Sequence, residues 1–198
     1  MSEAKELDEL RANEFTAEEI KKLIRLKVET TLVRSARLED SEVIEHHNKD
    51  DYVYGHWMAF ILISGSSVRT MLKIHFTSDS ARKMLGSKVR KVKDQSTLER
   101  MAMDFMKEQC NLMAGSLKSA FNSHNIITGL SIPLVTRGFD EAVFSDKVDH
   151  SKINDVWRLR WPEGEVTCSS VTEVLHWGDF QGYTFQEEDE EEEDGVFL

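Results

Sequence analysis

Five residues of the segment 103–121 have types and a spacing that could do chemistry. Asp104, Glu108, Asn111, Gly115 and Lys118 follow one another at intervals of four, three, four and three, which gathers them into one stripe along a helix. A carboxylate can pair with a lysine, and a carboxamide can hold one water molecule. Neither Glu108 nor Asn111 is a nucleophile, and two ligands are too few for a protein-held metal. The stripe therefore suits docking and water positioning, without a metal of its own.

The same stripe could instead be the solvated back of a core helix. Such a back is usually rich in Lys and Glu, whereas Asn and Gly are poor helix formers. Gly115 in mid-helix costs about 1 kcal/mol relative to Ala, which favours a close approach by another molecule at that point. Spacing by itself leaves both explanations open. In either case the apolar arc of the helix is predicted to face the core, and it consists of Leu98, Met101, Ala102, Phe105, Leu112, Met113 and Ala120.

Capping patterns predict two long helices. Thr16 and Glu19 form a capping-box pattern ahead of apolar residues at helical spacing, so a first helix is expected from Thr16 to about Arg34. Ser96 and Glu99 repeat the pattern, and they are expected to open the helix that carries the stripe, which ends near residues 122–125. A short helix is expected over residues 79–85, before Gly86.

Alternating and apolar runs predict the strands. VYGHWMAFILI and VRTMLKIHF, joined by SGSS, form one expected hairpin, and VWRLRW and EVTCSSVTEVL, joined by PEGE, form a second. A short strand is expected around Val43, and Pro133 is expected at an edge or bulge of the strand 126–138. Helix, short strand and hairpin thus occur twice. The prediction is an α/β (α+β) domain in which two long helices pack on a largely antiparallel sheet built from two similar halves.

Composition and charge exclude several classes of protein. Residues 187–194 are all acidic and account for most of the formal net charge of −11, and the only basic cluster, residues 87–94, is short, so no nucleic-acid partner is expected. Cys110 and Cys168 fit buried thiols in a reducing compartment. The first 15 residues lack an apolar signal region and no apolar run could span a bilayer, which predicts a cytoplasmic protein without a membrane partner. The expected organisation is an N-terminal extension (1–15), one domain (16–180) and an acidic disordered tail (181–198).

The acidic tail is expected to contribute nothing to the fold, because a run of eight carboxylates cannot be packed. Deleting every residue after Gln186 should therefore leave the thermal unfolding midpoint and the activity almost unchanged. Thermal melts of the truncated and full-length proteins test this. A large loss of stability in the truncated protein would contradict the prediction.

The string ERMAMDFMKEQCNLMAGSLKSAF, followed by GLSIPLVTRG, resembles the CheX and CheC family of chemotaxis phosphatases, which includes the flagellar switch phosphatase FliY. The active helix of that family carries an Asp or Ser, then a Glu, then an Asn, with a proline-bearing strand just over twenty residues on. Asp104, Glu108, Asn111 and Pro133 occupy those places here. The first helix has Val28 and Thr31 at the depth of Glu108 and Asn111, so a single-site, CheX-like protein is the better analogy.

The resemblance implies the reaction and the partners. Glu108 would bind the active-site lysine of a phosphorylated CheY-like response regulator, and Asn111 would orient a water in line with the aspartyl phosphorus. The Mg²⁺ and the acyl phosphate would belong to the regulator, so the protein would need no cofactor of its own. Asp104, Gly115 and Lys118 would contribute to binding, and the relatives' sheet-edge dimers suggest a homodimer.

Two other functions are compatible with the same residues. In the first, the same stripe binds a regulator without hydrolysis, as an adaptor or a module related to the flagellar switch. In the second, Cys110 serves as the nucleophile of a thiol enzyme. The apolar side of the helix on which Cys110 falls argues against the thiol enzyme, and the carboxamide within the stripe favours the phosphatase over the adaptor.

Overall fold

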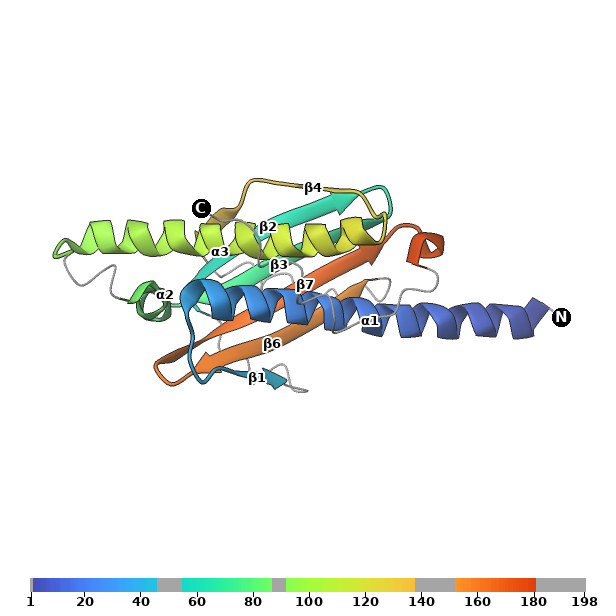
Figure 1. Ribbon diagram of the computed structural model, residues 1–198, viewed down its shortest axis with the longest axis horizontal. Helices are drawn as coiled ribbons and strands as arrows, with labels where there is room; N and C mark the ends of the chain where they lie inside the picture. Colours follow the sequence, from blue (N-terminus) through green and yellow to red (C-terminus); the bar gives the residue numbers. More distant parts are fainter. Residues whose placement is uncertain (1, 46–54, 87–91, 138–151, 181–198) are drawn as a thin grey trace.

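The computed structural model describes residues 2–45, 55–86, 92–137 and 152–180, with side chains described from residue 11 onward. The basic cluster lies mostly outside these residues, and the acidic tail lies wholly outside them. Figure 1 shows two long helices lying across one face of an antiparallel sheet. They are α1 (Ser2–Ala36) and α3 (Gln95–Ser123), and they pack against each other as well as on the sheet. The predicted fold class is therefore confirmed.

Helix α1 begins much earlier than the sequence predicts. It starts at Ser2 and not at Thr16, because residues 2–15 contain good helix formers and neither Gly nor Pro. Glu19 does not close a capping box; its carboxylate pairs with Lys22 at 2.8 Å, and the side chain is buried. The expected start was thus wrong, since a capping pattern permits a helix terminus but does not require one. In Figure 1 the N-terminal part of α1 extends beyond the sheet.

The strands form one sheet in the order β1-β6-β7-β3-β2-β4, with β5 also paired to β2. Both predicted hairpins are present, as β2 (Trp57–Gly65) with β3 (Val68–Phe76) and as β6 (Ile153–Trp161) with β7 (Gly164–Val174). The short strand expected around Val43 is β1 (Glu42–Glu45). The expected strand 126–138 is divided into β4 (Thr128–Leu130) and β5 (Leu134–Arg137), and Pro133 lies between them, as predicted for a residue that cannot donate to a ladder.

The two halves of the chain exchange their short strands. β1, from the first half, pairs with β6 of the second hairpin, whereas β4 and β5, from the second half, pair with β2 of the first hairpin. The central contact joins the two hairpins through β3 and β7. Each half of the chain thus completes the sheet of the other.

The core lies between the helices and one face of the sheet. On β3 the residues of this face alternate with residues of the other face, so Leu72 and Ile74 are buried while Arg69 is exposed. Arg25 of α1 adds a polar anchor to β6, since its guanidinium donates to both oxygens of the buried Asp155 at 2.5 and 2.7 Å and lies over the Trp157 ring. Hydrogen bonding to Asp155 raises the pKa of Arg25 above its ordinary value. The anchor fixes the rotation of α1 on the sheet.

The remaining helices are short. α2 (Ser78–Leu85) begins at a capping box between Thr77 and Ser80 and ends at Gly86, as predicted, and it packs against α3. A single 3₁₀ turn, η3 (Trp177–Phe180), places the Phe180 ring edge-on to Phe121 of α3, with 6.4 Å between ring centroids. Both elements hold the ends of α3 in place.

Helix α3 starts within two residues of Ser96, as predicted, but its N-cap is Asp94. The Asp94 carboxylate accepts from the Thr97 N–H at 2.8 Å and from the Ser96 hydroxyl at 2.7 Å. The expected capping box of Ser96 with Glu99 was therefore wrong, because an acidic residue two positions earlier caps the helix instead. Hydrogen bonds from Thr97 and Ser96 hold the pKa of Asp94 at about 2, below its ordinary 3.8.

The lowered pKa of Asp94 predicts a pH dependence of stability. A carboxyl whose pKa is depressed by folding stabilises the protein above its unfolded pKa of 3.8, and this contribution is lost as the pH falls toward about 2. Asn caps a helix as well as Asp does but does not titrate. As the pH falls from 3.8 to about 2, the thermal unfolding midpoint of the Asp94→Asn variant should therefore decrease less than that of the wild type. Circular dichroism measures both thermal unfolding midpoints. Equal decreases of the midpoint in the two proteins would show that the Asp94 cap makes no titrating contribution.

Candidate functional site

The predicted stripe lies on the outer side of α3. Asp104, Glu108 and Asn111 are exposed, while Gly115 and Lys118 are half-buried. The opposite side of the helix is fixed in the core, where the buried side chains are those of Met106, Cys110, Met113 and Leu117. Because Glu108 and Asn111 are three residues apart on a well-packed helix, they project in nearly the same direction from a rigid support.

The apolar arc of α3 is rotated relative to the predicted one. Leu112, expected in the core, is 38% exposed, and Phe105 is only half-buried. The prediction for Leu112 was wrong because the buried face of α3 is centred on Met106, Cys110 and Met113. Leu112 lies more than a quarter turn around the helix from the centre of that face. An apolar shoulder therefore lies beside the stripe, on the side of α3 toward Gln109, and it consists of Met101, Phe105 and Leu112.

A polar contact between the two long helices sets the rotation of α3. The side chain of Gln109 is buried, and its Oε1 accepts a hydrogen bond from the Ser35 hydroxyl of α1. Gln109 precedes Cys110 and follows Glu108 in the chain, so the contact holds one side of this turn against α1 and leaves Glu108 facing outward. Gln109 was not predicted as a functional residue, and the only sign of its role in the sequence is that a polar residue falls within the apolar side of the helix.

The polar groups of the stripe differ in how they are held. Asp104 pairs with Lys107 at 2.6 Å on the helix surface. Across the described residues, no side chain forms a hydrogen bond or an ion pair with Glu108 or with Asn111. Both groups are thus available to a partner, whereas Asp104 would have to exchange its contact with Lys107.

Gly115 is not required by the fold. Apart from its two chain neighbours and the adjacent backbone of α3, a Cβ added there would meet no atom within 4 Å, and the residue lies inside a regular helix. The space around Gly115 is therefore open in the free protein, which agrees with a reason for the glycine that lies outside this chain.

Replacing Gly115 with Ala separates stability from binding. Gly115→Ala should raise the free energy of unfolding by about 1 kcal/mol, because alanine is the better helix former. If a partner approaches the helix closely at this point, the same variant should bind that partner more weakly. Chemical denaturation and a binding titration measure the two effects. A stabilised variant with unchanged binding would remove Gly115 from the binding surface.

The thiol enzyme is not supported by the structure. Cys110 is fully buried, and burial raises the pKa of its thiol to about 12. Burial also raises the pKa of Cys168. A thiol that is neutral and inaccessible at neutral pH cannot attack a substrate in solution.

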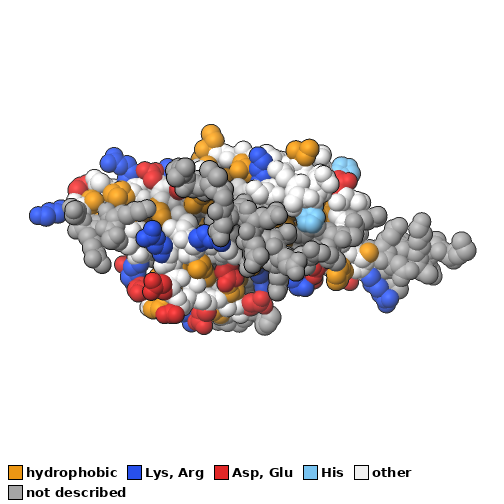
Figure 2. All heavy atoms as spheres, viewed as in Figure 1, with side chains coloured by type: hydrophobic (Ala, Val, Ile, Leu, Met, Phe, Trp, Pro, Cys, Tyr) orange, Lys and Arg blue, Asp and Glu red, His pale blue; other side chains and the backbone are white. Residues whose placement is uncertain are grey.

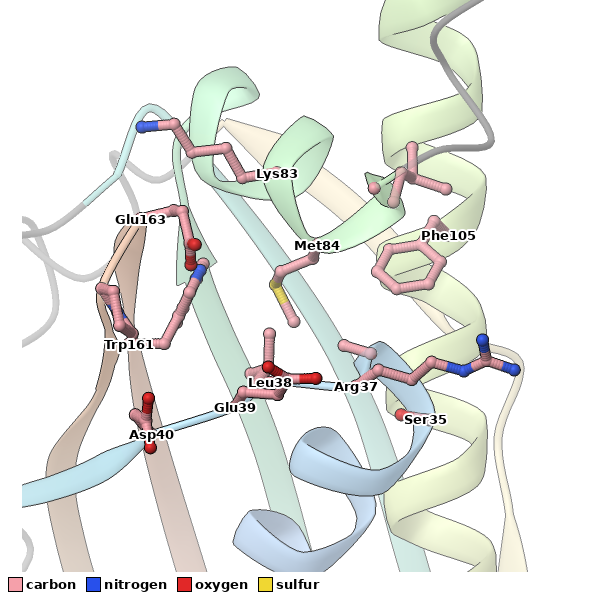
Figure 3. Close-up of a pocket in the computed structure, with 14 residues that line it drawn as sticks. Ser35, Arg37, Leu38, Glu39, Asp40, Lys83, Met84, Phe105, Trp161 and Glu163 are labelled. Atoms are coloured by element: carbon pink, nitrogen blue, oxygen red, sulfur yellow. The ribbon is translucent and has the colours of Figure 1, made fainter.

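A cavity of about 550 Å³ lies beside the first turns of the stripe. Figure 3 shows Leu38, Met84 and Phe105 pointing toward it from the segment after α1, from α2 and from α3, with Lys83 and Glu163 at its margin. Phe105 is the residue of α3 that lines the cavity, so the cavity lies next to the apolar shoulder that flanks the stripe. No pattern in the sequence predicts this cavity, because its walls come from segments far apart in the chain.

The described residues show neither a metal site nor a membrane span. In residues 2–45, 55–86, 92–137 and 152–180, no three His, Cys, Asp or Glu side chains lie close enough together to bind a metal ion. None of the helices in these ranges is long and apolar enough to cross a membrane.

Comparison with known proteins agrees with this geometry. Residues 57–153, which include all of α3, match the family model of the chemotaxis phosphatase CheX. No curated protein matches the sequence significantly.

Several solved structures share the fold. The CheX protein of a CheX-CheY-BeF3-Mg²⁺ complex from Borrelia burgdorferi has a TM-score of 0.63 at 12% identity, over 77% of this chain and 96% of that one. Chemotaxis protein CheX from Vibrio vulnificus has a TM-score of 0.57 at 16% identity, over 76% of this chain and 97% of that one. A chemotaxis protein CheX from Desulfovibrio desulfuricans has a TM-score of 0.54 at 18% identity, over 78% of this chain and 99% of that one.

The fold and the site define the class of this protein: an antiparallel sheet covered by two long helices, one of which presents a carboxylate and a carboxamide to solvent. The match of residues 57–153 to the CheX family model, together with the fold shared with solved CheX structures, makes this protein similar to CheX and CheC-like proteins, as its sequence indicates.

The first half of the chain has no pair equivalent to Glu108 and Asn111 at the corresponding positions, Val28 and Thr31. Val28 is buried, so it could not reach a partner, and Thr31 donates to the Lys27 carbonyl at 2.6 Å. The predicted equivalence of Val28 and Thr31 to Glu108 and Asn111 depends on a helix start at Thr16, whereas α1 starts at Ser2.

Proposed function

We propose that this protein accelerates hydrolysis of the aspartyl phosphate of a phosphorylated, CheY-like response regulator in chemotaxis or a related two-component pathway. The observation that carries the proposal is the exposure of Glu108 and Asn111 on the same side of α3, inside the segment that matches the CheX family model. A related fold has been solved as a CheX-CheY-BeF3-Mg²⁺ complex, which supports a CheY-like partner.

Asn111 has the groups needed to position a water molecule. Its carboxamide can donate to and accept from one water, and the side chain stands free of other described residues. The water would attack the phosphorus, forming a new P–O bond while the bond between phosphorus and the aspartyl oxygen breaks, so that the products are inorganic phosphate and the free carboxylate. Placing the water in line is an entropic contribution to catalysis.

Glu108 would supply the charged contact. Its carboxylate can pair with a lysine of the regulator's active site, and this pair would fix the regulator relative to Asn111. Asp104 and Lys118 would contact the surrounding surface of the regulator, and Gly115 would allow its loops to approach. The Mg²⁺ would be held by the regulator, because its acyl phosphate is the group that the ion must neutralise.

The protein would act in the cytoplasm, where response regulators are found, and it would form a homodimer. The rival function is an adaptor that binds a regulator without hydrolysing its phosphate. The presence of Asn111 beside Glu108 favours the phosphatase, since a docking surface has no need of a water-holding amide at this position.

A panel of phosphorylated receiver domains tests the proposal. Each domain is labelled at its aspartyl phosphate, and phosphate release is followed with and without the purified protein. At least one domain should lose its label faster in the presence of the protein. Binding to a receiver domain without any acceleration would instead establish the adaptor.

A further inference from the structure

Exposed apolar side chains are concentrated at one sheet edge. Of the six large apolar side chains that are exposed among the described residues, four lie within residues 127–134 and one more is Leu112 of α3. Ile127 and Ile132 are each 80% exposed. The four side chains of the edge, Ile127, Leu130, Ile132 and Leu134, are called the apolar ridge below. Such a concentration on a soluble surface marks an interaction site.

The ridge is held on a fixed backbone. β4 and β5 both pair with β2, and the segment between them is tied down as well, because the Ser131 N–H donates to the Leu62 carbonyl at 2.9 Å and the Leu62 N–H donates to the Ser131 hydroxyl at 3.0 Å. The apolar side chains are therefore presented by an ordered edge of the sheet and not by a free loop.

The ridge adjoins α3 on the side opposite α1. α3 contacts β2, β4 and β5, and Figure 1 places it between α1 and this edge. Apolar side chains stand out along the upper edge of Figure 2, where Figure 1 draws β4. The polar stripe thus runs between two apolar surfaces, the shoulder with Leu112 toward α1 and the ridge toward β4 and β5.

A partner centred on Glu108 and Asn111 needs more surface than the stripe provides. A specific protein–protein contact covers roughly 800 Å² and 20–30 residues on each partner, whereas the stripe has five residues. The partner must therefore extend over neighbouring surface. The other edge of the sheet, at β1, is charged, with Glu42 paired to Arg160 and Glu45 paired to Arg25, and it lies beyond α1. Of the two apolar surfaces beside the stripe, the ridge offers four exposed large side chains, whereas the shoulder offers only Leu112.

We infer that the apolar ridge is the docking surface for an apolar patch beside the active site of the phosphorylated receiver domain, an inference that rests on the proposed function. A second copy of this chain fits the ridge less well as an extended sheet. Residues 131–133 interrupt the ladder, leaving strands of three and four residues, and Pro133 has no N–H to offer a further strand. Recognition at this edge is therefore by side chains.

Two serine variants test the inference. Ile127→Ser and Ile132→Ser remove apolar surface without adding charge, and the matched control is Phe15→Ser, which removes an exposed apolar side chain from the N-terminal half of α1. The probe is a receiver domain saturated with beryllium fluoride and Mg²⁺. Each ridge variant should raise the dissociation constant about tenfold, from loss of a buried apolar side chain. KM should rise in parallel while kcat stays unchanged, because apolar contacts at a distance act equally in the ground state and the transition state.

The outcomes separate this inference from the function on which it rests. Ridge variants that bind like the Phe15→Ser control, while the wild type binds and hydrolyses, would overturn the ridge as a docking surface and leave the phosphatase intact. A wild type that binds no receiver domain would overturn the proposed function itself. Light scattering gives the third outcome: serine variants that turn a dimer into a monomer without weakening receiver binding would show that a second copy covers the ridge. Unchanged thermal midpoints confirm that the variants are folded.

Discussion

Replacing Asn111 with Ala is expected to lower the maximal rate of phosphate release by on the order of 10²-fold or more, while the complex with the receiver domain still forms. A group that positions the attacking water contributes mainly in the transition state, so its loss appears in kcat and not in affinity. The exposed position of Asn111 on a well-packed helix means that the variant should stay folded, with a change in stability within about 0.5 kcal/mol.

Single-turnover loss of label from a phosphorylated receiver domain measures this rate, and binding is followed separately with the beryllium fluoride complex. Asn122→Ala is the matched control, because it makes the same change at an exposed position near the end of the same helix. The control should behave like the wild type. An Asn111→Ala protein that hydrolyses at the wild-type rate would remove Asn111 from the reaction.

Glu108→Ala is expected to weaken binding as well as to slow turnover. If Glu108 pairs with the regulator's lysine, the variant loses an intermolecular charge pair, which should cost about 2 kcal/mol of association, or roughly 30-fold in the dissociation constant. The rate at saturation should fall too, since the pair also orients the regulator relative to Asn111. No described side chain of this protein pairs with Glu108, so no internal contact is lost with it.

The charge dependence of Glu108 gives a second measurement. Glu108→Gln keeps the shape but not the charge, so it should also weaken binding, and the effect of either variant should shrink as salt is raised. The control is Glu99→Ala, which removes an exposed glutamate nine residues earlier on the same helix and should leave binding unchanged. Binding that is insensitive to Glu108 but lost in Asn111→Ala would reverse the two assigned roles.

The two variants also separate the phosphatase from the adaptor. In a phosphatase, Asn111→Ala binds and fails to hydrolyse, whereas Glu108→Ala binds poorly. In an adaptor, wild-type protein binds the receiver domain and never accelerates phosphate loss, so Asn111→Ala would have no rate to lower. The proposed ridge adds a third pattern, in which KM rises and kcat does not change.

Local patterns in the sequence determined the elements and the stripe. The 3.6-residue period placed Asp104, Glu108 and Asn111 on one exposed side of α3, and period-two alternation with turn residues placed both hairpins. Pro133 could be assigned to an edge or bulge because it lacks an N–H. These predictions succeeded because side-chain direction within a helix or a strand follows from backbone geometry alone.

Contacts between distant segments decided the rest. The period shows that α3 has an apolar side, but the position of α1 and the sheet fixes how far that side is buried, so Leu112 is exposed and Gln109 is buried. In the same way, the short strands could be placed in the sequence but not in the sheet, where each half pairs with the hairpin of the other. The ridge along β4 and β5 became visible only then, because exposure depends on what packs against a residue and not on its neighbours in the chain.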